Sequence, residues 1–528
     1  MSENFILELK LEYNANEKAY LDKVFWSAKN IYNCELSRIE KKYKELRKTR
    51  KYRFIFNFLI EVSNKLDKLT NQLGIMRDYH FLFKKTKKYK QMIAKEKEKI
   101  RFLTKLQRYL NKERMKLINE IHISEYDIQS DLKRYSKQYK KLIPSQVLQK
   151  IGTTLAKSVN KNIFKYNPRF RYKNIYKLTS IEGKDNKSSI SFDLDNFLLN
   201  IGLKTSKNNR YKKIKVCSKL SKYEKEALNN KICYCRIVRK DNIRGKSKYY
   251  LQLVLEGKTP IKSSKKNNKQ GKVGIDTGTT TMAICGENEV HFVKLAKKAN
   301  SLNDKIEKLQ SSVDKSKKAT NPNKYNEDGT YKRTRSKWVY SNRCKKKLSK
   351  LRDLQRKQKV YRKEEHCKLA DKILTMGNVI NVEPINYKGL AKRRKIEDGI
   401  TKKGFGKSVN HCAPSSFLTI LKNKTLNVGK KYQEINTSKC KASQYNHNIN
   451  KFEKVDLSVR VKEVGGYKVQ RDLYSAFLIM NVDGSLEKIS KEQCDIKFED
   501  FIKHQDLEIK RLKETKEDQS SNFGLEEF

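Results

Sequence analysis

Three carboxylates in the sequence could do chemistry together, because each lies beside a short apolar run. Asp276 ends the run in "GKVGID", Glu383 follows "NVINV", and Asp472 precedes the apolar residues of "LYSAFLIM". Two Mg²⁺ ions about 4 Å apart, held by acidic oxygens, can hydrolyse a phosphodiester, one activating water and the other stabilising the leaving oxygen. Without metal, carboxylates brought together would repel and raise one another's pKa. Each residue alone is better explained as a turn or cap, but the three together favour a nuclease.

The stretch "GIDTGTT" has a second interpretation. It also resembles the first phosphate loop of actin-like ATPases and sugar kinases, in which an aspartate after a strand and small turn residues meet nucleotide phosphates and metal. That class needs a second phosphate loop and a glycine-rich adenosine motif downstream, and the sequence shows neither, since Gly465-Gly466 is isolated. An actin-like ATPase is therefore the less favoured alternative.

Apolar periodicity predicts the elements that must position these residues. Leu7, Leu9 and Leu11 alternate with charged residues, as in a half-buried strand. A helix follows, for which Asn16 can serve as the N-cap, and Trp26 is expected in the core on its apolar face. No proline occurs before Lys141, and apolar residues repeat at helical spacing up to that point, which predicts a lobe of several long helices with basic outer faces.

The pattern changes at Pro144 and Ser145, which open one more helix with an apolar face. Residues 170–260 are predicted to be rich in β-strands, and a linker follows them. After Asp276 come a strand at "EVHFVKL" and a basic helical stretch over residues 296–375, broken by "SKKATNPNKYNEDGTYK". The residues from Asp483 on are comparatively acidic, and the sequence assigns no role to them.

The charge of the chain points to a polyanionic partner. The chain has 528 residues, with 121 Lys and Arg against 59 Asp and Glu, so its formal net charge is +62. Codon bias of an AT-rich genome can increase the number of lysines, but it does not explain why acidic residues are so much fewer than basic residues. Nucleic acid is the partner that such a surplus fits. On the helical stretch before residue 375 we expect the basic face to contact phosphates rather than only solvent.

Membrane and secretory features are missing from the sequence. No run reaches the roughly 18 apolar residues of a membrane span, and the N-terminus lacks a basic region followed by an apolar stretch. The ten cysteines are scattered, so neither a disulfide framework nor a zinc pattern is predicted. We expect a protein of the prokaryotic cytosol, associated with the nucleoid, with reduced thiols and no membrane partner.

Three motifs in this order carry a family resemblance. "GIDTGTTTMA", "INVEPINYKGLAKR" and "QRDLYSAF" resemble the three RuvC motifs of the TnpB proteins of transposons and of their descendants, the compact type V CRISPR effectors. Further segments resemble motifs in that family's N-terminal half. They are "VFWSAKNIYN", "PSQVLQKIGTTLAKSVNKNIF" with "PRFR", and "KYYLQLVLEG". The similarity extends from about residue 5 to about residue 482.

The resemblance implies a multidomain α+β protein. Its parts would be a helical recognition lobe, a β-barrel wedge domain and an RNase H-like α/β RuvC nuclease domain. The implied boundaries are 1–12 for the first strand of the wedge barrel, 13–143 for the recognition lobe, 144–260 for the remainder of the wedge domain, 261–270 for a linker, 271–435 for the RuvC domain with motifs I and II, 436–468 for a degenerate zinc-finger-like insertion that would bind target nucleic acid, 469–482 for motif III, and 483–528 for a C-terminal tail.

The resemblance also implies an activity and its partners. The protein would be an RNA-guided DNA endonuclease in which Asp276, Glu383 and Asp472 are catalytic and coordinate two Mg²⁺ ions. It would bind a structured guide RNA, either a crRNA or a transposon-derived omega RNA, recognise a short motif beside the target, and cleave double-stranded DNA that pairs with the guide. A nuclease-inactive, RNA-guided repressor is the other alternative, although all three carboxylates are present. The sequence leaves open whether one protein copy or a homodimer shares one RNA.

Basic residues near the motifs are the expected contacts to nucleic acid. They are Lys392, Arg393, Arg394 and Lys395 of "GLAKRRK" beside the proposed active site, Arg169 and Arg171 of "PRFR", and Arg471 of the third motif.

The sequence departs from the family pattern at two places. Family members commonly carry paired CxxC zinc ligands between the second and third motifs, whereas this chain has only Cys440 and His447 there. A closed zinc site needs four ligands, so we expect no zinc and a window held together by packing. The third motif usually has an aspartate and an asparagine where this chain has Gln470 and Tyr474, which puts the rate of cleavage in doubt.

Overall fold

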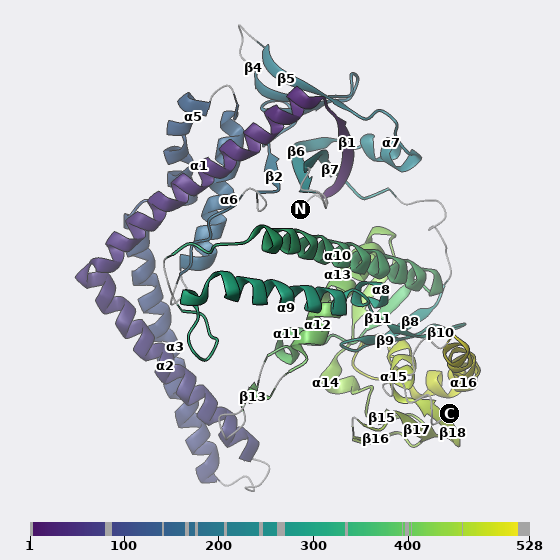
Figure 1. Ribbon diagram of the computed structural model, residues 1–528. Coiled ribbons are helices and arrows are strands. Elements are labelled where there is room, and N and C mark those ends of the chain that lie inside the picture. Colours follow the sequence, from purple (N-terminus) through teal and green to yellow (C-terminus); the bar gives the residue numbers. More distant parts are fainter. Residues whose placement is uncertain are drawn as a thin grey trace. The chain divides into compact units, whose positions relative to one another are not determined.

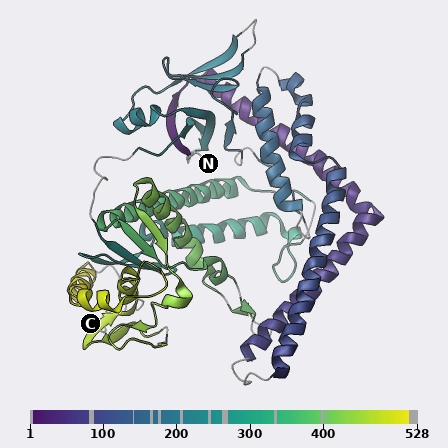
Figure 2. The ribbon, with the colours of Figure 1, turned by 180° about the vertical axis from the view of Figure 1, so that it is seen from behind.

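The computed structural model describes residues 4–79, 87–139, 142–163, 168–174, 178–204, 209–241, 247–260, 270–332, 336–392, 394–395, 401–402, 404–456 and 458–515. The chain forms two compact units, one made of Met1–Asp241 with Ser247–Lys258 and the other chiefly of residues 259–528. Two views of the ribbon show the elements of both units (Figures 1 and 2). Among the described residues, no helix is long and apolar enough to cross a membrane.

Long helices make up much of the first unit, as the periodicity predicts. They are α1 (Ala15–Lys48), α2 (Arg50–Tyr79), α3 (Lys87–Glu120), α4 (Glu125–Leu132), α5 (Arg134–Tyr139) and α6 (Ser145–Ile163). Helices α2 and α3 lie side by side along most of their length (Figure 1). The predicted start of α6 at Pro144 and Ser145 is confirmed.

Two expectations for α1 are wrong. Its N-cap is Asn14 rather than Asn16, because Asn14 and Glu17 form a capping box in which each side chain accepts a hydrogen bond from the other's backbone N–H. Trp26 is not in the core: 53% of it is exposed. Residue 26 falls outside the stripe formed by Leu21, Phe25 and Ala28, and Lys29 lies over its ring instead.

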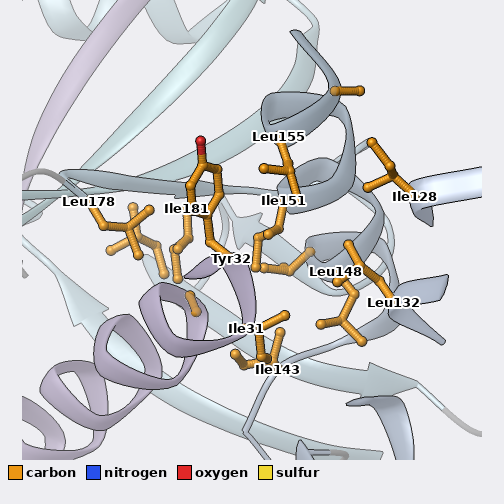
Figure 3. Close-up of a cluster of buried hydrophobic side chains, with 14 of the residues drawn as sticks. Ile31, Tyr32, Ile128, Leu132, Ile143, Leu148, Ile151, Leu155, Leu178 and Ile181 are labelled. Atoms are coloured by element: carbon orange, nitrogen blue, oxygen red, sulfur yellow. The ribbon is translucent and has the colours of Figure 1, made fainter. Parts of the chain in front are cut away.

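The core of the first unit joins helices to strands. Figure 3 shows Tyr32 of α1, Leu132 of α4, Leu148 and Leu155 of α6, and Ile181 packed together. Each of these side chains is nearly fully buried. Helix α6 and the strand that contains Ile181 therefore pack against α1, the helix that directly follows the first strand.

An antiparallel sheet completes the first unit. Its strands are β1 (Asn4–Glu12), β2 (Ser180–Glu182), β3 (Ile190–Asp193), β4 (Leu198–Lys204), β5 (Asn209–Val216), β6 (Ile232–Asp241) and β7 (Ser247–Glu256), with α7 (Lys222–Leu228) between β5 and β6. Their order is β2-β6-β7-β1-β5-β4-β3, and contacts of β3 with β6 bring the sheet close to closure. The expected mixed α+β fold and the β-rich region after residue 170 are thus confirmed.

A five-stranded sheet is the centre of the second unit. Its strands are β8 (Lys272–Thr277), β9 (Thr281–Cys285), β10 (Val290–Lys294), β11 (Val379–Val382) and β14 (Lys431–Glu434), in the order β10-β9-β8-β11-β14. The first three are antiparallel neighbours, whereas β8, β11 and β14 run parallel. The carboxyl ends of β8 and β11 therefore meet at one edge of the sheet.

Helices cover both faces of this sheet. Val273, Ile275 and Ile380 share one core cluster with side chains of α10 (Asn342–Met376) and α13 (Pro414–Asn427). Because side chains alternate along a strand, Gly274 and Asp276 face the other side. There α15 (Arg471–Met480) packs against β8 and β9, and α16 (Lys491–Glu514) packs against β10.

Shorter elements connect these layers. They are α8 (Lys297–Asn300), α9 (Asn303–Thr320), a 3₁₀ turn (Pro322–Lys324), α11 (Tyr387–Leu390), β12 (Arg394–Lys395), β13 (Thr401–Lys402), α12 (Gly406–Cys412), α14 (Thr437–Cys440), β15 (Tyr445–Asn446), β16 (Lys451–Phe452), β17 (Val461–Val464) and β18 (Tyr467–Gln470). The predicted basic helical stretch over residues 296–375 corresponds to α8, α9 and α10. Its break overlaps the expected one but starts later, because α9 continues to Thr320, and ends later, because α10 begins at Asn342.

Helix α16, within the described residues after Asp483, contributes apolar side chains to the core. Phe498, Phe501 and Ile502 of α16 are buried against Tyr474 and Phe477 of α15. The sequence assigned this region no role, but its apolar face covers the helix that carries Asp472.

Candidate active site

Two of the three predicted carboxylates lie at the ends of neighbouring parallel strands. Asp276 is the fifth residue of β8, and Glu383 directly follows β11. The Glu383 N–H donates to the carbonyl of Ile275 at 3.3 Å, and the Thr277 hydroxyl donates to the carbonyl of Glu383 at 3.1 Å. Backbone pairing therefore fixes these two residues beside each other.

The third carboxylate, Asp472, is brought to the same edge by a close helix-to-sheet contact. A Cβ at Gly274 would lie 2.1 Å from the carbonyl oxygen of Ala476 and 2.3 Å from the backbone nitrogen of Met480. Only a residue without a side chain lets α15 approach β8 this closely. The buried Asn381 side chain adds a second link, since it donates to the carbonyl of Ile479 at 3.2 Å.

The start of α15 is fixed by Gln470. Its side chain accepts a hydrogen bond from the N–H of Leu473 at 2.7 Å and so caps the helix. Its own N–H donates to the side chain of Gln505 in α16 at 2.9 Å. Gln470, which departs from the usual third motif, thus fixes the start of α15 and places Asp472 in its first turn.

The three carboxylates line one cavity of about 700 Å³. Gly278, Thr279 and Thr280 of the turn after β8 line another part of its wall. The basic residues of the cavity are Lys454, Arg460 and Arg471, and the half-exposed ring of Phe405 also borders it. A negatively charged strand entering this cavity would therefore meet cations as well as the acidic cluster.

Electrostatics links the three carboxylates. Burial, and then the negative charges of Asp472 and Glu383, raise the pKa of Asp276 well above its ordinary value. Burial also raises the pKa of Glu383. A bound cation would offset this repulsion and keep Asp276 ionised at neutral pH.

Two arginines hold Asp472. Arg471 donates to one oxygen of its carboxylate at 3.2 Å, and Arg460 lies 3.6 Å from the other oxygen. Arg471 is itself fixed by a hydrogen bond to the carbonyl of Val459 at 3.0 Å. In the part of the chain that the structure describes, no group of three or more His, Cys, Asp or Glu side chains is arranged to hold a metal ion as it stands.

The donor set nevertheless fits magnesium in its chemistry. Three carboxylates that converge on one cavity offer the hard oxygen ligands that Mg²⁺ prefers, and a cation there would offset the negative charges that help to raise the pKa of Asp276. Asp472 would have to exchange arginine contacts for the cation.

Sequence reasoning missed three residues of the site. The Tyr387 hydroxyl donates to the carbonyl of Gly278 at 3.3 Å and holds the turn after β8, and burial raises its pKa to about 12. Arg460 and Lys454 reach the cavity from the segment before β17. A tyrosine in "INYKGL" close to Glu383 was a usable indication, whereas no sequence pattern marks Arg460 as a neighbour of Asp472.

The predicted nucleic-acid contacts are placed differently. Lys392 is exposed in the second unit, whereas Arg169 and Arg171 are exposed in the first. Arg393 lies outside the described residues, and Arg394 and Lys395 are described only as the backbone of β12, which pairs with β13. Arg471 is 9% exposed and engaged with Asp472, so any contact it makes to nucleic acid would be made within the cavity.

Several described side chains between residues 436 and 468 pack into the core of the second unit. Cys440, Tyr445 and Val464 belong to the same core cluster as α15. His447 is buried, and its ring nitrogen lies 2.6 Å from the hydroxyl of Tyr474, the second residue that departs from the usual motif. Tyr474 therefore ties the insertion to the helix of Asp472.

No protein-family model matches the sequence, and no curated protein matches it. Among solved structures, "Cryo-EM structure of the Cas12f1-sgRNA-target DNA complex" matches with 13% identity and a TM-score of 0.44, over 91% of this chain and 99% of that chain. "Cryo-EM structure of CRISPR-Cas12f Ternary Complex" matches with 12% identity and a TM-score of 0.24, over 90% and 99%. Both titles name Cas12f.

Proposed function

We propose that the chain is an RNA-guided DNA endonuclease of the TnpB and compact type V kind. The observation that carries the proposal is the convergence of Asp276, Glu383 and Asp472, from segments about a hundred residues apart in sequence, on one cavity that also contains Lys454, Arg460 and Arg471. An acidic cluster alone would repel a nucleic-acid strand. Cations beside it supply the phosphate contacts that bring the strand to the carboxylates.

The topology of the second unit supports the nuclease proposal. The sheet has three antiparallel strands followed, after intervening helices, by two parallel strands. One carboxylate lies on its first strand and another directly follows its fourth, in agreement with the RNase H-like RuvC fold that the motifs imply. By the same resemblance, the antiparallel sheet of the first unit is the wedge domain and helices α1–α5 are the recognition lobe.

The chemistry would be divided between metal and protein. Asp276, Glu383 and Asp472 would hold Mg²⁺, which supplies activation of a water molecule and stabilisation of the leaving oxygen. Tyr387 holds the turn after β8 in place, and Gln470 sets the position of Asp472. Arg460 and Lys454 bind and orient the phosphate of the strand to be cut.

The partners follow from the charge and the resemblance. A formal net charge of +62 suits a guide RNA and a double-stranded DNA target that present phosphates over long surfaces. Contacts by Lys and Arg read the shape of the guide–target duplex, whereas base pairing with the guide supplies the sequence specificity.

One observation favours a second candidate, an RNA-guided DNA binder that does not cut. Arg460 and Arg471 contact both oxygens of Asp472, which leaves that carboxylate occupied. If these contacts persist when nucleic acid is bound, the cluster lacks its third ligand and the protein would act as a repressor.

The experiment that tests the proposal uses protein purified with its co-expressed RNA. The RNA is sequenced, and matched DNA is offered in Mg²⁺ and in EDTA. We expect a discrete RNA and cleavage that needs both Mg²⁺ and a match to that RNA. Guided binding without cleavage would support the repressor, metal-independent cleavage would contradict the mechanism, and absence of any discrete RNA would contradict guidance.

A further inference from the structure

Three aromatic rings cluster in the segment that joins α9 to α10. Tyr325 and Tyr331 have ring centroids 5.0 Å apart, and the Trp338 ring lies 6.0 Å from the first and 5.7 Å from the second. These three side chains, called the aromatic cluster below, lie outside the cavity of the carboxylates. None of the roles assigned above uses them.

The segment that carries the aromatic cluster is held in place by its own contacts. The Asn321 side chain donates to the carbonyl of Val339 at 2.8 Å and accepts from the N–H of Val339 at 2.9 Å, which ties the two ends together. The backbone N–H of Lys332 donates to the carbonyl of Lys324 at 2.9 Å. Lys324 is buried, and its ammonium donates to the carbonyl of Ser336 at 2.7 Å.

These contacts keep large aromatic surfaces in solvent. Tyr331 is 58% exposed and Trp338 is 37% exposed, and the neighbouring Val339 is 61% exposed. Rings that served only to stabilise the loop would be buried inside it. Rings that pack edge to edge and still expose this much surface to water are suited to bind a flat, apolar ligand.

Cations accompany the rings. The Lys324 ammonium lies 4.6 Å from the centroid of Trp338, and the Lys318 ammonium lies 6.0 Å from that of Tyr325. Lys332 and Lys337 are exposed beside Tyr331 and Trp338. Flat apolar surface next to positive charge matches a nucleobase with its phosphate, whereas it fits an uncharged apolar peptide poorly.

We propose that the aromatic cluster binds unpaired bases of single-stranded nucleic acid by stacking on Tyr331 and Trp338, with Lys318 and Lys332 near the phosphates. Unpaired bases are required because a base inside a duplex offers no free face to a protein ring. The inference rests on the nucleic-acid partner of the proposed function but not on DNA cleavage. Guide RNA and a displaced DNA strand share this chemistry, so the test includes both.

Trp338 provides its own reporter, because the chain has only two tryptophans. The variant Trp26→Phe, in a position that is half exposed and outside the second unit, leaves Trp338 as the only one. RNA-free full-length protein with this change is titrated with oligouridine and with oligodeoxythymidine of about 16 nucleotides, and with a duplex of equal length. Tryptophan emission and its quenching by acrylamide are recorded.

Stacking predicts that a single strand lowers the emission of Trp338 and protects it from acrylamide, while the duplex does so less. Stronger effects with RNA would assign the cluster to the guide, and stronger effects with DNA would assign it to a displaced strand. Adding Tyr331→Ala should weaken binding of the single strand at least about fivefold, since base–aromatic stacking is lost. Leu507→Ala, which removes a large side chain that is 64% exposed on α16, is the control and should leave affinity unchanged.

Several results would overturn the inference. Binding of the single strand, detected by a filter assay, with no change in the emission or acrylamide quenching of Trp338 would mean that the aromatic cluster only stabilises its own loop. Equal protection by the duplex would remove the requirement for unpaired bases. Trp338 that is already inaccessible to acrylamide in the free protein would show that another part of the chain covers the cluster. Absence of any nucleic-acid binding would remove the proposed function as well.

Discussion

The three carboxylates could be found from the sequence because each has an apolar neighbour that fixes its place. A residue after "NVINV" or "GKVGI" must lie at a strand end, and Asp472 must begin a helix whose other residues are buried. Arg460 could not be found in this way, because its role depends on a 3.6 Å approach to Asp472 that no local pattern encodes.

Asp276 is the residue whose change tests the site most directly. Asp276→Asn keeps the shape of the side chain but removes the negative charge that a cation needs. Removing a residue that only supports a metal ligand lowers activity up to about a hundredfold. Since Asp276 would itself be a ligand, we expect the rate of cleavage to fall by more than that, while guided DNA binding is retained. Cleavage rates and band shifts measure the two effects. Asp500→Asn, an exposed residue of α16, is the control, and a similar loss of activity in that variant would argue against a specific role.

Glu35 predicts a pH effect in the first unit. This carboxyl of α1 is fully buried, and burial raises its pKa to about 7, although Arg38 lies 3.6 Å away. Since the folded state favours the protonated form, the stability that Glu35 contributes is complete below its ordinary pKa of 4.5 and is lost as the pH rises towards 7.

Glu35→Gln should therefore increase the free energy of unfolding at pH 8, by up to about 3 kcal/mol, and should change it much less near pH 5. Urea unfolding at the two pH values measures the difference. Glu45→Gln, at an exposed position of the same helix, should show no such dependence. A loss of stability at pH 8 on replacing Glu35 would contradict the raised pKa.

At the scale of elements, the local sequence pattern predicted whether a segment forms a helix or a strand better than it predicted where the element starts or which of its faces is buried. The alternation in β1, the apolar run of β8 and the spacing in α6 and α10 were sufficient to predict these elements. The N-cap of α1 was placed two residues late, because the choice between Asn14 and Asn16 depends on the reciprocal bond with Glu17. Helix α16 was missed because its apolar residues are spaced among many charges and are buried only by tertiary contacts with α15, β10 and β18.

Gly274 carries a prediction about how α15 and β8 fit together. Gly274→Ala would place a methyl group 2.1 Å from the carbonyl of Ala476, so the helix must move away from the sheet. Forced overpacking costs about 1–3 kcal/mol or more, and here the shift also moves Asp472 from Asp276. Thermal unfolding and DNA cleavage should both be impaired.

Gly484→Ala is the matched control for this change, because a Cβ at residue 484 would have no atom within 4 Å. It should leave both the unfolding temperature and cleavage close to those of the parent protein. An equal effect of the two substitutions would mean that loss of glycine flexibility, rather than the close contact at Gly274, is responsible.

At the scale of the whole molecule, composition and motif order predicted a mixed α+β chain with a polyanionic partner. Two compact units with separate sheets bear out the mixed fold. Composition could not indicate how surface charges are used. Some lysines and arginines are already committed within the protein, as Arg471 is to Asp472 and Lys324 is to Ser336.

The remaining excess of positive charge makes a prediction that concerns the whole surface. If many lysines and arginines contact phosphates, binding releases the counterions of the nucleic acid. Affinity for the guide RNA should then fall by about a thousandfold or more between about 50 and 200 mM salt, as for a protein with six to ten phosphate contacts. Fluorescence anisotropy with labelled RNA measures this fall. Asp276→Asn should show nearly the same salt dependence, because it changes one charge inside the cavity. An affinity that hardly responds to salt would mean that the net charge of +62 is not what binds nucleic acid.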